Sequence, residues 1–551
     1  MLFLKKNSLV LFFLCWLLIN LFQSGLTELF DDEAYYWVYS KYLSWGYFDH
    51  PPMIAVLIKA GYFLFPNEFG VRFFITILSA STFIIIYDLL QQKNKALFFY
   101  IVCTIAILQI VGFIAIPDIP LLFFTALFFW LYRRFLQKKS FFNALLLGLG
   151  MALMLYSKYH GVLIILFTLF SNLKLLKQPL AYMAVLFAVL LYAPHLSWQF
   201  YHGFPSVQYH LFERNPSHYK FSYTTGYILG QILVAGPFMG WLLIGQSLKY
   251  KPTDLFEKAL KFSLLGIYLF FLLATIKGRV EANWTAPAMI PLILLSHQAL
   301  LYEEKWKNIL RKSVPVTLFA VLALRIYMII DITPLSWFEK DEFHQNKKRA
   351  DLIKEKAGGL PVVFINSYQD ASKYWFYTGQ KSFSLNTPYH RRNNFNFWPI
   401  EDSLQGKKVY AVIFKNSPFF SDTIHKIYRS KPTRGRVVDN FFSYSSINLI
   451  CKNHFIVSEN KLIPQTIRLF IPPEKKYTLP APLNTYLYVY RADTVFASFK
   501  MLAQPVSGYW NLQSEENISL PKGKYVVRLA VPSAIPDNPS LNSSTYKLVV
   551  E

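Results

Sequence analysis

Long apolar runs separated by short polar segments dominate the first 331 residues of the chain. About eleven of these runs approach the roughly twenty apolar residues that cross a bilayer as a helix. The sixth run is short and is compatible with a half-helix. The pattern predicts an α-helical polytopic membrane domain with about 11 transmembrane helices. The predicted spans cover residues 8–27, 71–88, 96–116, 119–136, 141–157, 161–173, 179–194, 224–247, 259–276, 285–301 and 315–331.

The pattern changes after residue 331, where no further run is long enough to span a membrane. "PVVFIN" (361–366) and "KVYAVIF" (408–414) predict strands, and "SYQDASKYWFY" (367–377) predicts a helix between them. Beyond about residue 450, runs such as "TYLYVYRA" and "KYVVRLAV" alternate as strands do. We therefore predict a transmembrane domain over 1–331 with an outer loop over 28–70, an α/β domain over 332–450 and a β-rich module over 451–551.

Composition and charge agree with a membrane protein. The chain has 551 residues, of which 54% are hydrophobic, and a net charge of +24. A soluble protein of this charge would suggest nucleic acid as a partner. Here alternate loops, beginning with Lys5 and Lys6, are much richer in Lys and Arg than the others, as the positive-inside rule requires. The rule predicts the lipid bilayer as partner, a cytoplasmic N-terminus, C-terminal domains outside the cytoplasm and no nucleic acid.

The sequence lacks several common metal-binding, nucleotide-binding and protease motifs. The three cysteines show no metal or disulfide spacing. The chain also has no P-loop, no G-x-G-x-x-G after a strand, no H-E-x-x-H and no G-x-S-x-G. These absences predict no nucleotide cofactor and no familiar protease site.

The stretch "DDEAYYW" opens the first predicted outer loop with three adjacent carboxylates, Asp31, Asp32 and Glu33. Acidic residues at this position are often helix caps that favour the positive end of the helix dipole. The Tyr and Trp residues that follow are typical of a helix lying in the membrane interface. Such a helix would hold a carboxylate where it could act as a general base on a hydroxyl group.

Other ionisable residues fall on the same predicted outer side. Asp118 lies between two prolines where two apolar runs meet, and is either a surface turn or a functional carboxylate. Lys158 and Arg279 could extend their charges to the lipid headgroups or bind an anionic phosphate.

Asp49 and His50 precede two prolines, and the pair is either a turn or a metal-binding or phosphate-binding pair. His195 and His202 lie in a later loop and could join Asp49 in holding a divalent metal ion. Their spacing matches no specific metal signature.

The ordered set of outer stretches resembles the bacterial integral-membrane glycosyltransferases of the dolichyl-phosphate-mannose–protein mannosyltransferase type. These enzymes have the C-type glycosyltransferase fold and include the lipid A aminoarabinose transferase. The resemblance covers residues 25–300 well and "RRNNFNFWP" (391–399) more weakly. The stretches that carry it are "DDEAYYW", "WGYFDHPPM", "GVRF", "IPDIPLLF", "LYSKYHGVL", "APHLSWQFYHGFPS" and "GRVEANWTAPA".

The resemblance implies roles for particular residues. Asp32 matches the catalytic carboxylate of the family, with Glu33 beside it, and Asp118 matches the second acidic position. His50 stands where the aminoarabinose transferase branch has a Lys that meets the donor phosphate, so Lys158 or Arg279 is the alternative phosphate ligand. Asp49 stands where that branch has a Glu that can join a metal site.

The resemblance also implies an activity. We expect an inverting glycosyltransferase of the bacterial cytoplasmic membrane that moves a sugar from a polyprenyl-phosphate donor to an envelope glycolipid such as lipopolysaccharide or lipid A. Transfer to Ser or Thr of proteins is the alternative within this class. A lipid or solute transporter and a non-catalytic scaffold are the alternatives outside it.

Overall fold

A computed structural model describes most of the chain as two compact units. Unit 1 comprises Met1–Ser206 and His218–Thr333, and unit 2 comprises Val207–Ser217 and Pro334–Glu551. Lys5 and Lys6 and the predicted start of the α/β domain at 332 lie outside the described residues. The described residues are 8–214, 219–331, 341–424, 432–451, 454–471, 479–491 and 494–551.

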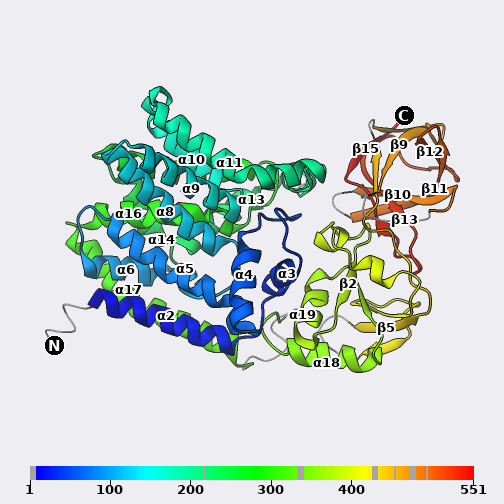
Figure 1. Cartoon of the computed structure of the whole chain (residues 1–551), viewed down its shortest axis with the longest axis horizontal. Coiled ribbons are helices and arrows are strands. Elements are labelled where there is room, and N and C mark those ends of the chain that lie inside the picture. The colour runs from blue at the N-terminus through cyan, green and yellow to red at the C-terminus, as the bar shows by residue number, and fades with distance from the viewer. Residues whose placement is uncertain are drawn as a thin grey trace. The chain divides into compact units, whose positions relative to one another are not determined.

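Unit 1 is built of helices, and its last helix lies beside its first (Figure 1). Its elements in chain order are α2 (Ser8–Leu26), α3 (Asp31–Lys41), α4 (Met53–Leu64), α5 (Glu68–Leu89), α6 (Lys95–Thr104), α7 (Ala106–Val111), α8 (Asp118–Gln137), α9 (Phe141–Ser157), α10 (Gly161–Ser171), η1 (Leu173–Lys177), α11 (Pro179–Tyr201), α12 (Pro205–Gln208), α13 (Phe221–Ala235), α14 (Gly240–Lys249), α15 (Leu255–Ala274), η3 (Ala282–Ala288), α16 (Met289–Leu300) and α17 (Glu304–Ile329).

Five of these helices, α2, α5, α8, α11 and α17, are long and apolar enough to cross a membrane. Only 22% of the apolar window of α11, and 28% of those of α2 and α17, is buried inside the protein. Apolar side chains left outside a protein core need a hydrocarbon surrounding. Unit 1 is therefore a multi-pass membrane domain. Every predicted span falls on a helix, but the count of about eleven spans is not confirmed.

Two predicted spans are not single straight helices. The run 224–247 forms α13 and α14, which are bent by 94° relative to one another. Gly236 has φ 145° and precedes a proline, which disfavours helical backbone at the residue before it. The run 96–116 forms α6 and α7, which break at Ile105, where Gln109 Nε2 donates to the carbonyl of Cys103 at 2.7 Å.

Helices α4 and α5 approach so closely that only glycine fits between them. A Cβ atom on Gly61 of α4 would overlap the carbonyl oxygen of Gly70 on α5. Gly61→Ala should therefore destabilise the protein by about 1–3 kcal/mol, since backbone cannot move aside as a side chain can. Gly245→Ala is the matched control, because no atom lies within 4 Å of its added Cβ. Equal unfolding midpoints of the two variants in detergent would contradict this packing.

Unit 2 begins with an α/β layer. Its five-stranded sheet has the order β2-β1-β3-β5-β4, in which β1 is parallel to β2 and β3, and β5 is antiparallel to both of its neighbours. The predicted strands at 361–366 and 408–414 are confirmed as β1 and β3, and the predicted helix is confirmed as α19. The elements are α18 (Asn346–Ala357), β1 (Val362–Ile365), α19 (Tyr368–Thr378), β2 (Ser382–Leu385), η4 (Asn394–Asn396), η5 (Glu401–Leu404), β3 (Val409–Ile413), β4 (Asp422–Ile424) and β5 (Thr433–Val438).

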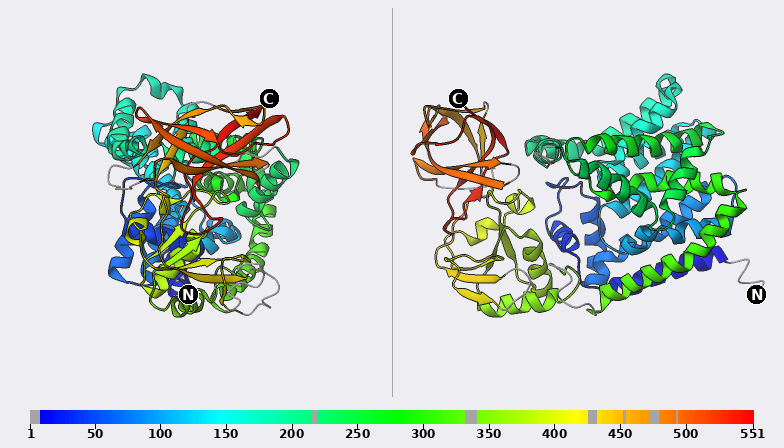
Figure 2. Two further views of the ribbon diagram at one scale, coloured as in Figure 1. Left: turned by 90° about the vertical axis from the view of Figure 1, so that its right-hand side faces the viewer. Right: turned by 180° about the vertical axis from the view of Figure 1, so that it is seen from behind.

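The C-terminal part of unit 2 is a ten-stranded sheet, which confirms the predicted β-rich module. Its order is β6-β9-β12-β11-β10-β13-β15-β7-β8, with β14 paired to β13. The strands curve around a hydrophobic core that includes Phe455, Ile467 and Leu529 (Figure 2). The strands are β6 (Asn448–Cys451), β7 (Phe455–Ser458), β8 (Lys461–Leu462), β9 (Gln465–Phe470), β10 (Leu483–Arg491), β11 (Thr494–Val506), β12 (Tyr509–Ser514), β13 (Gly523–Val531), β14 (Ser540–Leu541) and β15 (Tyr546–Val550).

Candidate active site

The three adjacent carboxylates form the first turn of α3 and face different surroundings. Asp31 and Glu33 are buried, with exposed fractions of 5% and 0%, whereas Asp32 is partly exposed. Glu33 Oε2 accepts a hydrogen bond from the backbone N–H of Phe30 at 3.0 Å, which caps the start of the helix. Asp32 is therefore the accessible carboxylate of the three, at a helix end that favours negative charge.

Helix α3 is not an interfacial helix with one solvated face, which corrects the sequence prediction. Tyr35, Tyr36, Trp37 and Tyr39 are all at most 5% exposed. Tyrosine rings that pack edge to face against one another, such as Tyr35 and Tyr39 at 4.9 Å, let the helix bury every side. The aromatic residues thus hold the helix inside the protein.

Glu33 forms a fully buried ion pair with Arg72 of α5. Arg72 Nε donates to Glu33 Oε1 at 2.7 Å, and Arg72 Nη2 donates to Glu33 Oε2. The same guanidinium donates to the carbonyls of Ser24 and Thr27 at 3.0 and 2.6 Å. The backbone N–H of Ala115 donates to Glu33 Oε1 at 2.7 Å. This geometry favours a positioning role for Glu33, and the catalytic role expected from the sequence stays a prediction.

The contact with Ala115 matters because that residue precedes Asp118 by three positions. Asp118 begins α8 and is 5% exposed. Its Oδ1 accepts from Lys158 Nζ at 2.8 Å, and its Oδ2 accepts from Asn283 Nδ2 at 3.3 Å. Lys158 lies at the end of α9 and is itself 5% exposed. The structure thus joins two predicted site residues, Asp118 and Lys158, in one buried pair.

Arg279 and His50 are more exposed than the buried pair of Asp118 and Lys158. The Arg279 side chain is 73% exposed, and its Nε lies 3.5 Å from Glu281 Oε1. The His50 ring is partly exposed and packs edge to face against Tyr36 at 5.6 Å. Of the three predicted phosphate ligands, Arg279 is the most accessible cation.

The predicted metal ligands have other partners. Asp49 Oδ2 accepts hydrogen bonds from the hydroxyls of Tyr35 and Tyr39 at 3.1 and 3.4 Å. Burial raises the pKa of Tyr39 well above its ordinary value, which keeps that hydroxyl protonated as a donor. His195 Nδ1 lies 2.7 Å from the Trp45 carbonyl, and its Nε2 lies 3.2 Å from the hydroxyl of Tyr159.

His202 is exposed, and its ring stacks on Trp198 at 4.3 Å. Within the part of the chain that the structure describes, Asp49, His195 and His202 are not gathered into one group of ligand atoms. The structure places His195 within α11 and His202 at its end, not in the predicted loop, and their contacts favour structural roles over a shared metal site.

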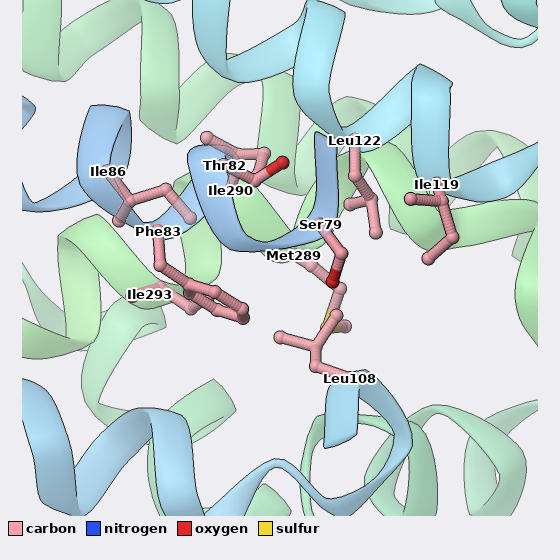
Figure 3. Close-up of a pocket in the computed structure, with 10 residues that line it drawn as sticks. All are labelled: Ser79, Thr82, Phe83, Ile86, Leu108, Ile119, Leu122, Met289, Ile290 and Ile293. Atoms are coloured by element: carbon pink, nitrogen blue, oxygen red, sulfur yellow. The ribbon is translucent and has the colours of Figure 1, made fainter. Parts of the chain in front are cut away.

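An apolar pocket opens beside the buried pair. Ile119, the residue after Asp118, and Leu122 line it from α8, and Ser79, Thr82, Phe83 and Ile86 line it from α5 (Figure 3). Leu108 of α7 and Met289, Ile290 and Ile293 of α16 complete the wall. The pocket is therefore mostly apolar, and Ile119 of its wall directly follows Asp118 in the chain.

Two residues of the site were missed as functional residues in the sequence. Arg72 and Asn283 occur in the quoted stretches "GVRF" and "GRVEANW", so their positions were noted but not their roles. Their partners, Glu33 and Asp118, are 39 and 165 residues away in the chain. No spacing rule links residues that far apart.

Comparisons with known proteins agree on one class of membrane glycosyltransferase. The family model of dolichyl-phosphate-mannose-protein mannosyltransferase matches residues 49–198. This range includes Asp118 and Lys158. The fold is that of two crystal structures of ArnT from Cupriavidus metallidurans, in the apo state and bound to undecaprenyl phosphate. Each has a TM-score of 0.56 and 13% identity, and the match covers 78% of this chain and 98% of ArnT.

A lipid A glycosyltransferase is also similar to the chain in sequence. The lipid A galacturonosyltransferase RgtD of Rhizobium johnstonii is 26% identical over 330 residues, which cover 57% of this chain and 69% of that protein. The resemblance to bacterial glycosyltransferases similar to the lipid A aminoarabinose transferase, drawn from the sequence, is therefore confirmed.

Proposed function

We propose that the chain transfers a sugar from a polyprenyl-phosphate donor to an envelope glycolipid of the lipid A class, with inversion at the anomeric carbon. This proposal rests on the different exposure of the carboxylates in the first turn of α3, which we call the acidic turn. Asp32 is accessible, while Glu33 beside it is buried and fixes the turn to the segment that leads to Asp118. The names of the similar proteins, which act on lipid A or bind undecaprenyl phosphate, support the substrate classes.

In the proposed mechanism Asp32 accepts the proton of the acceptor hydroxyl. The acceptor oxygen attacks the anomeric carbon in line with the bond to the donor phosphate, a new glycosidic bond forms, and the carbon–oxygen bond to phosphate breaks. The lipid phosphate leaves with the electron pair of that bond. A cation near its oxygens stabilises the developing charge.

Arg279 is the better candidate for that cation, because its side chain is 73% exposed whereas Lys158 is buried in its pair with Asp118. A requirement for a divalent cation remains a prediction of the sequence alone.

Arg279→Gln should raise the KM for the donor about tenfold and leave the unfolding midpoint unchanged. Its ion pair with Glu281 is exposed and contributes little to stability, whereas a charge-assisted contact with phosphate contributes more. Arg311→Gln is the matched control, because Arg311 is an exposed arginine of the other predicted face. An unchanged donor KM would remove Arg279 from the site.

We also propose that the chain lies in the bacterial cytoplasmic membrane with its N-terminus inside and unit 2 outside. The loop charges support this orientation. Cysteine labelling of unit 2 from outside intact spheroplasts tests it, and labelling that requires lysis would contradict it.

Comparison of cells with and without the gene tests the acceptor. We expect a glycolipid of lower mass, by one sugar residue, in the cells that lack it. The family model names protein mannosyltransferases, so protein transfer is the alternative. Loss of sugars from Ser or Thr with unchanged glycolipids would favour that alternative.

A further inference from the structure

The short apolar helix α4 lies where the spanning helix α2 ends. It has 12 residues. A helix of that length reaches about 18 Å, whereas the hydrocarbon core of a bilayer is about 30 Å thick. Helix α4 runs across α2 and not along it (Figures 1 and 2). The start of α5, just after α4, lies against the end of α2, because a Cβ atom on Gly25 would be 3.9 Å from the Cβ of Phe69. Helix α4 therefore lies at a membrane interface, on the predicted outer side.

One face of α4 is apolar and exposed. Val56, Ala60 and Phe63 recur at the spacing of a single helical face. The side chains of Val56 and Phe63 are 48% and 85% exposed, whereas Ile54 and Ile58, which face the protein interior, are 0% exposed. Such a face is typical of helices that lie in the plane of the membrane and bury one side in lipid. Hydrocarbon of the outer leaflet is therefore the expected surrounding of this face.

Two lysines, Lys41 and Lys59, border the apolar face, and we call them the lysine pair. Lys59 belongs to α4, Lys41 is the last residue of α3, and both are exposed. Lys41 Nζ lies 4.4 Å from the ring centre of Trp37 and 4.3 Å from that of Tyr62. Because Tyr62 follows Lys59 by three residues on the same helix, both lysines lie beside this one ring. Cation–π contacts hold the Lys41 ammonium in place without neutralising its charge.

The two ammonium groups repel each other. Burial and the charge of Lys59 lower the pKa of Lys41 below its ordinary value. Burial and the charge of Glu68 raise the pKa of Tyr62, so this carboxylate lies in the neighbourhood. Among the residues that the structure describes, however, neither lysine forms an ion pair with Glu68 or with any other carboxylate. An anion held between the lysines would relieve their repulsion.

We propose that α4 and the lysine pair form a docking surface for an anionic lipid of the outer leaflet. The lipid phosphate lies between Lys41 and Lys59, and its acyl chains lie along Val56, Ala60 and Phe63. A lysine binds phosphate as a point charge, and its apolar stem lets the ammonium reach the headgroup layer. An anionic headgroup fits two cations better than a zwitterionic one, which carries a cation of its own. This inference concerns binding alone and does not rest on the proposed function.

A photoreactive residue on the exposed face of α4 identifies what covers it. The full-length protein with p-benzoylphenylalanine in place of Phe63 would be illuminated in nanodiscs of equal phosphatidylglycerol and phosphatidylcholine, and its adducts identified by mass. We expect more adducts with phosphatidylglycerol than with phosphatidylcholine, by about fivefold for each lysine of the pair. The same replacement of Phe319 is the matched control, because Phe319 is 74% exposed on the spanning helix α17 and should show no such preference.

Substitutions in the lysine pair test the headgroup contact. Lys41→Gln and Lys59→Gln should each lower the preference for phosphatidylglycerol about fivefold, and together they should abolish it. Lys220→Gln is the matched control, because Lys220 is an exposed lysine elsewhere on the predicted outer side and should leave the preference unchanged. Equal capture of the two lipids by the unsubstituted lysine pair would overturn the proposal. A preference that survives the loss of both lysines in a folded protein would also overturn it.

Other occupants of the face give other adducts. Adducts between two copies of the chain would identify a contact between copies, and the absence of any adduct would identify a solvated face. Either result would overturn the lipid as the occupant.

The same assay separates this inference from the proposed function, because lipid capture needs no sugar donor. Preferential capture of phosphatidylglycerol by a protein without transferase activity would contradict the proposed function alone. Sugar transfer by a protein without this preference would contradict the docking surface alone.

Discussion

Asp32→Asn should lower turnover by about 10²–10⁴-fold, the range expected when a general base is removed. The amide cannot accept the acceptor proton, yet it has nearly the same shape as the carboxylate. Asp32 is partly exposed, unlike its neighbours Asp31 and Glu33, so the change should leave the fold intact. Turnover of a labelled polyprenyl-phosphate sugar by the purified variant measures the effect.

Asp88→Asn is the matched control for this substitution. Asp88 is 51% exposed and pairs with Lys93 and Arg133 at the far end of α5. It should keep turnover within about twofold, since surface pairs contribute little. Near-normal turnover in Asp32→Asn would contradict the assignment of Asp32 as the general base. The carboxylates of the acidic turn would then have a helix-capping role only.

Arg72→Met should cost about 3–5 kcal/mol of stability, because it leaves Glu33 as an uncompensated buried charge. The pair is 1% and 0% exposed, and Arg72 also holds backbone carbonyls of the segment before α3. We expect a large fall in the unfolding midpoint in detergent and loss of turnover in the protein that remains folded. Turnover should fall because Glu33 ties α3 to the segment before Asp118.

A second substitution and an exposed pair serve as controls. Arg72→Met combined with Glu33→Leu removes both charges and should recover part of the stability, since no charge is then left buried. Lys93→Gln breaks a pair whose members are 41% and 51% exposed and should cost less than about 1 kcal/mol. Equal losses of unfolding free energy in Arg72→Met and Lys93→Gln would show that the buried ion pair does not stabilise the site.

Much of the fold could be predicted from local pattern. Apolar runs predicted the five helices that are long enough to cross a membrane among the described residues. Short apolar runs predicted β1 and β3, and alternation predicted β10 and β13. The breaks in the runs 96–116 and 224–247 were missed, because average apolarity does not reveal a bend at Gly236 or Ile105. Helix α3 was placed correctly but assigned to the interface, because burial of a tyrosine-rich helix depends on partners elsewhere in the chain.

The candidate site was predicted less completely than the fold. Asp32, Asp118 and Lys158 could be named because ionisable groups at membrane boundaries are rare and the family motifs contain them. The pairing of Lys158 with Asp118, and of Arg72 with Glu33, joins residues 40 and 39 positions apart on different helices. Such pairings follow from helix packing, which the sequence alone does not specify.

The most direct test of the account is donor consumption by the purified protein. The protein in liposomes would be mixed with a polyprenyl-phosphate sugar and a phosphorylated glycolipid, and both lipids followed by mass spectrometry. The account predicts that the donor becomes polyprenyl phosphate while the glycolipid gains the mass of one sugar residue. Intact donor on both lipid leaflets, moved across the membrane without any glycosylated product, would contradict it and identify a transporter.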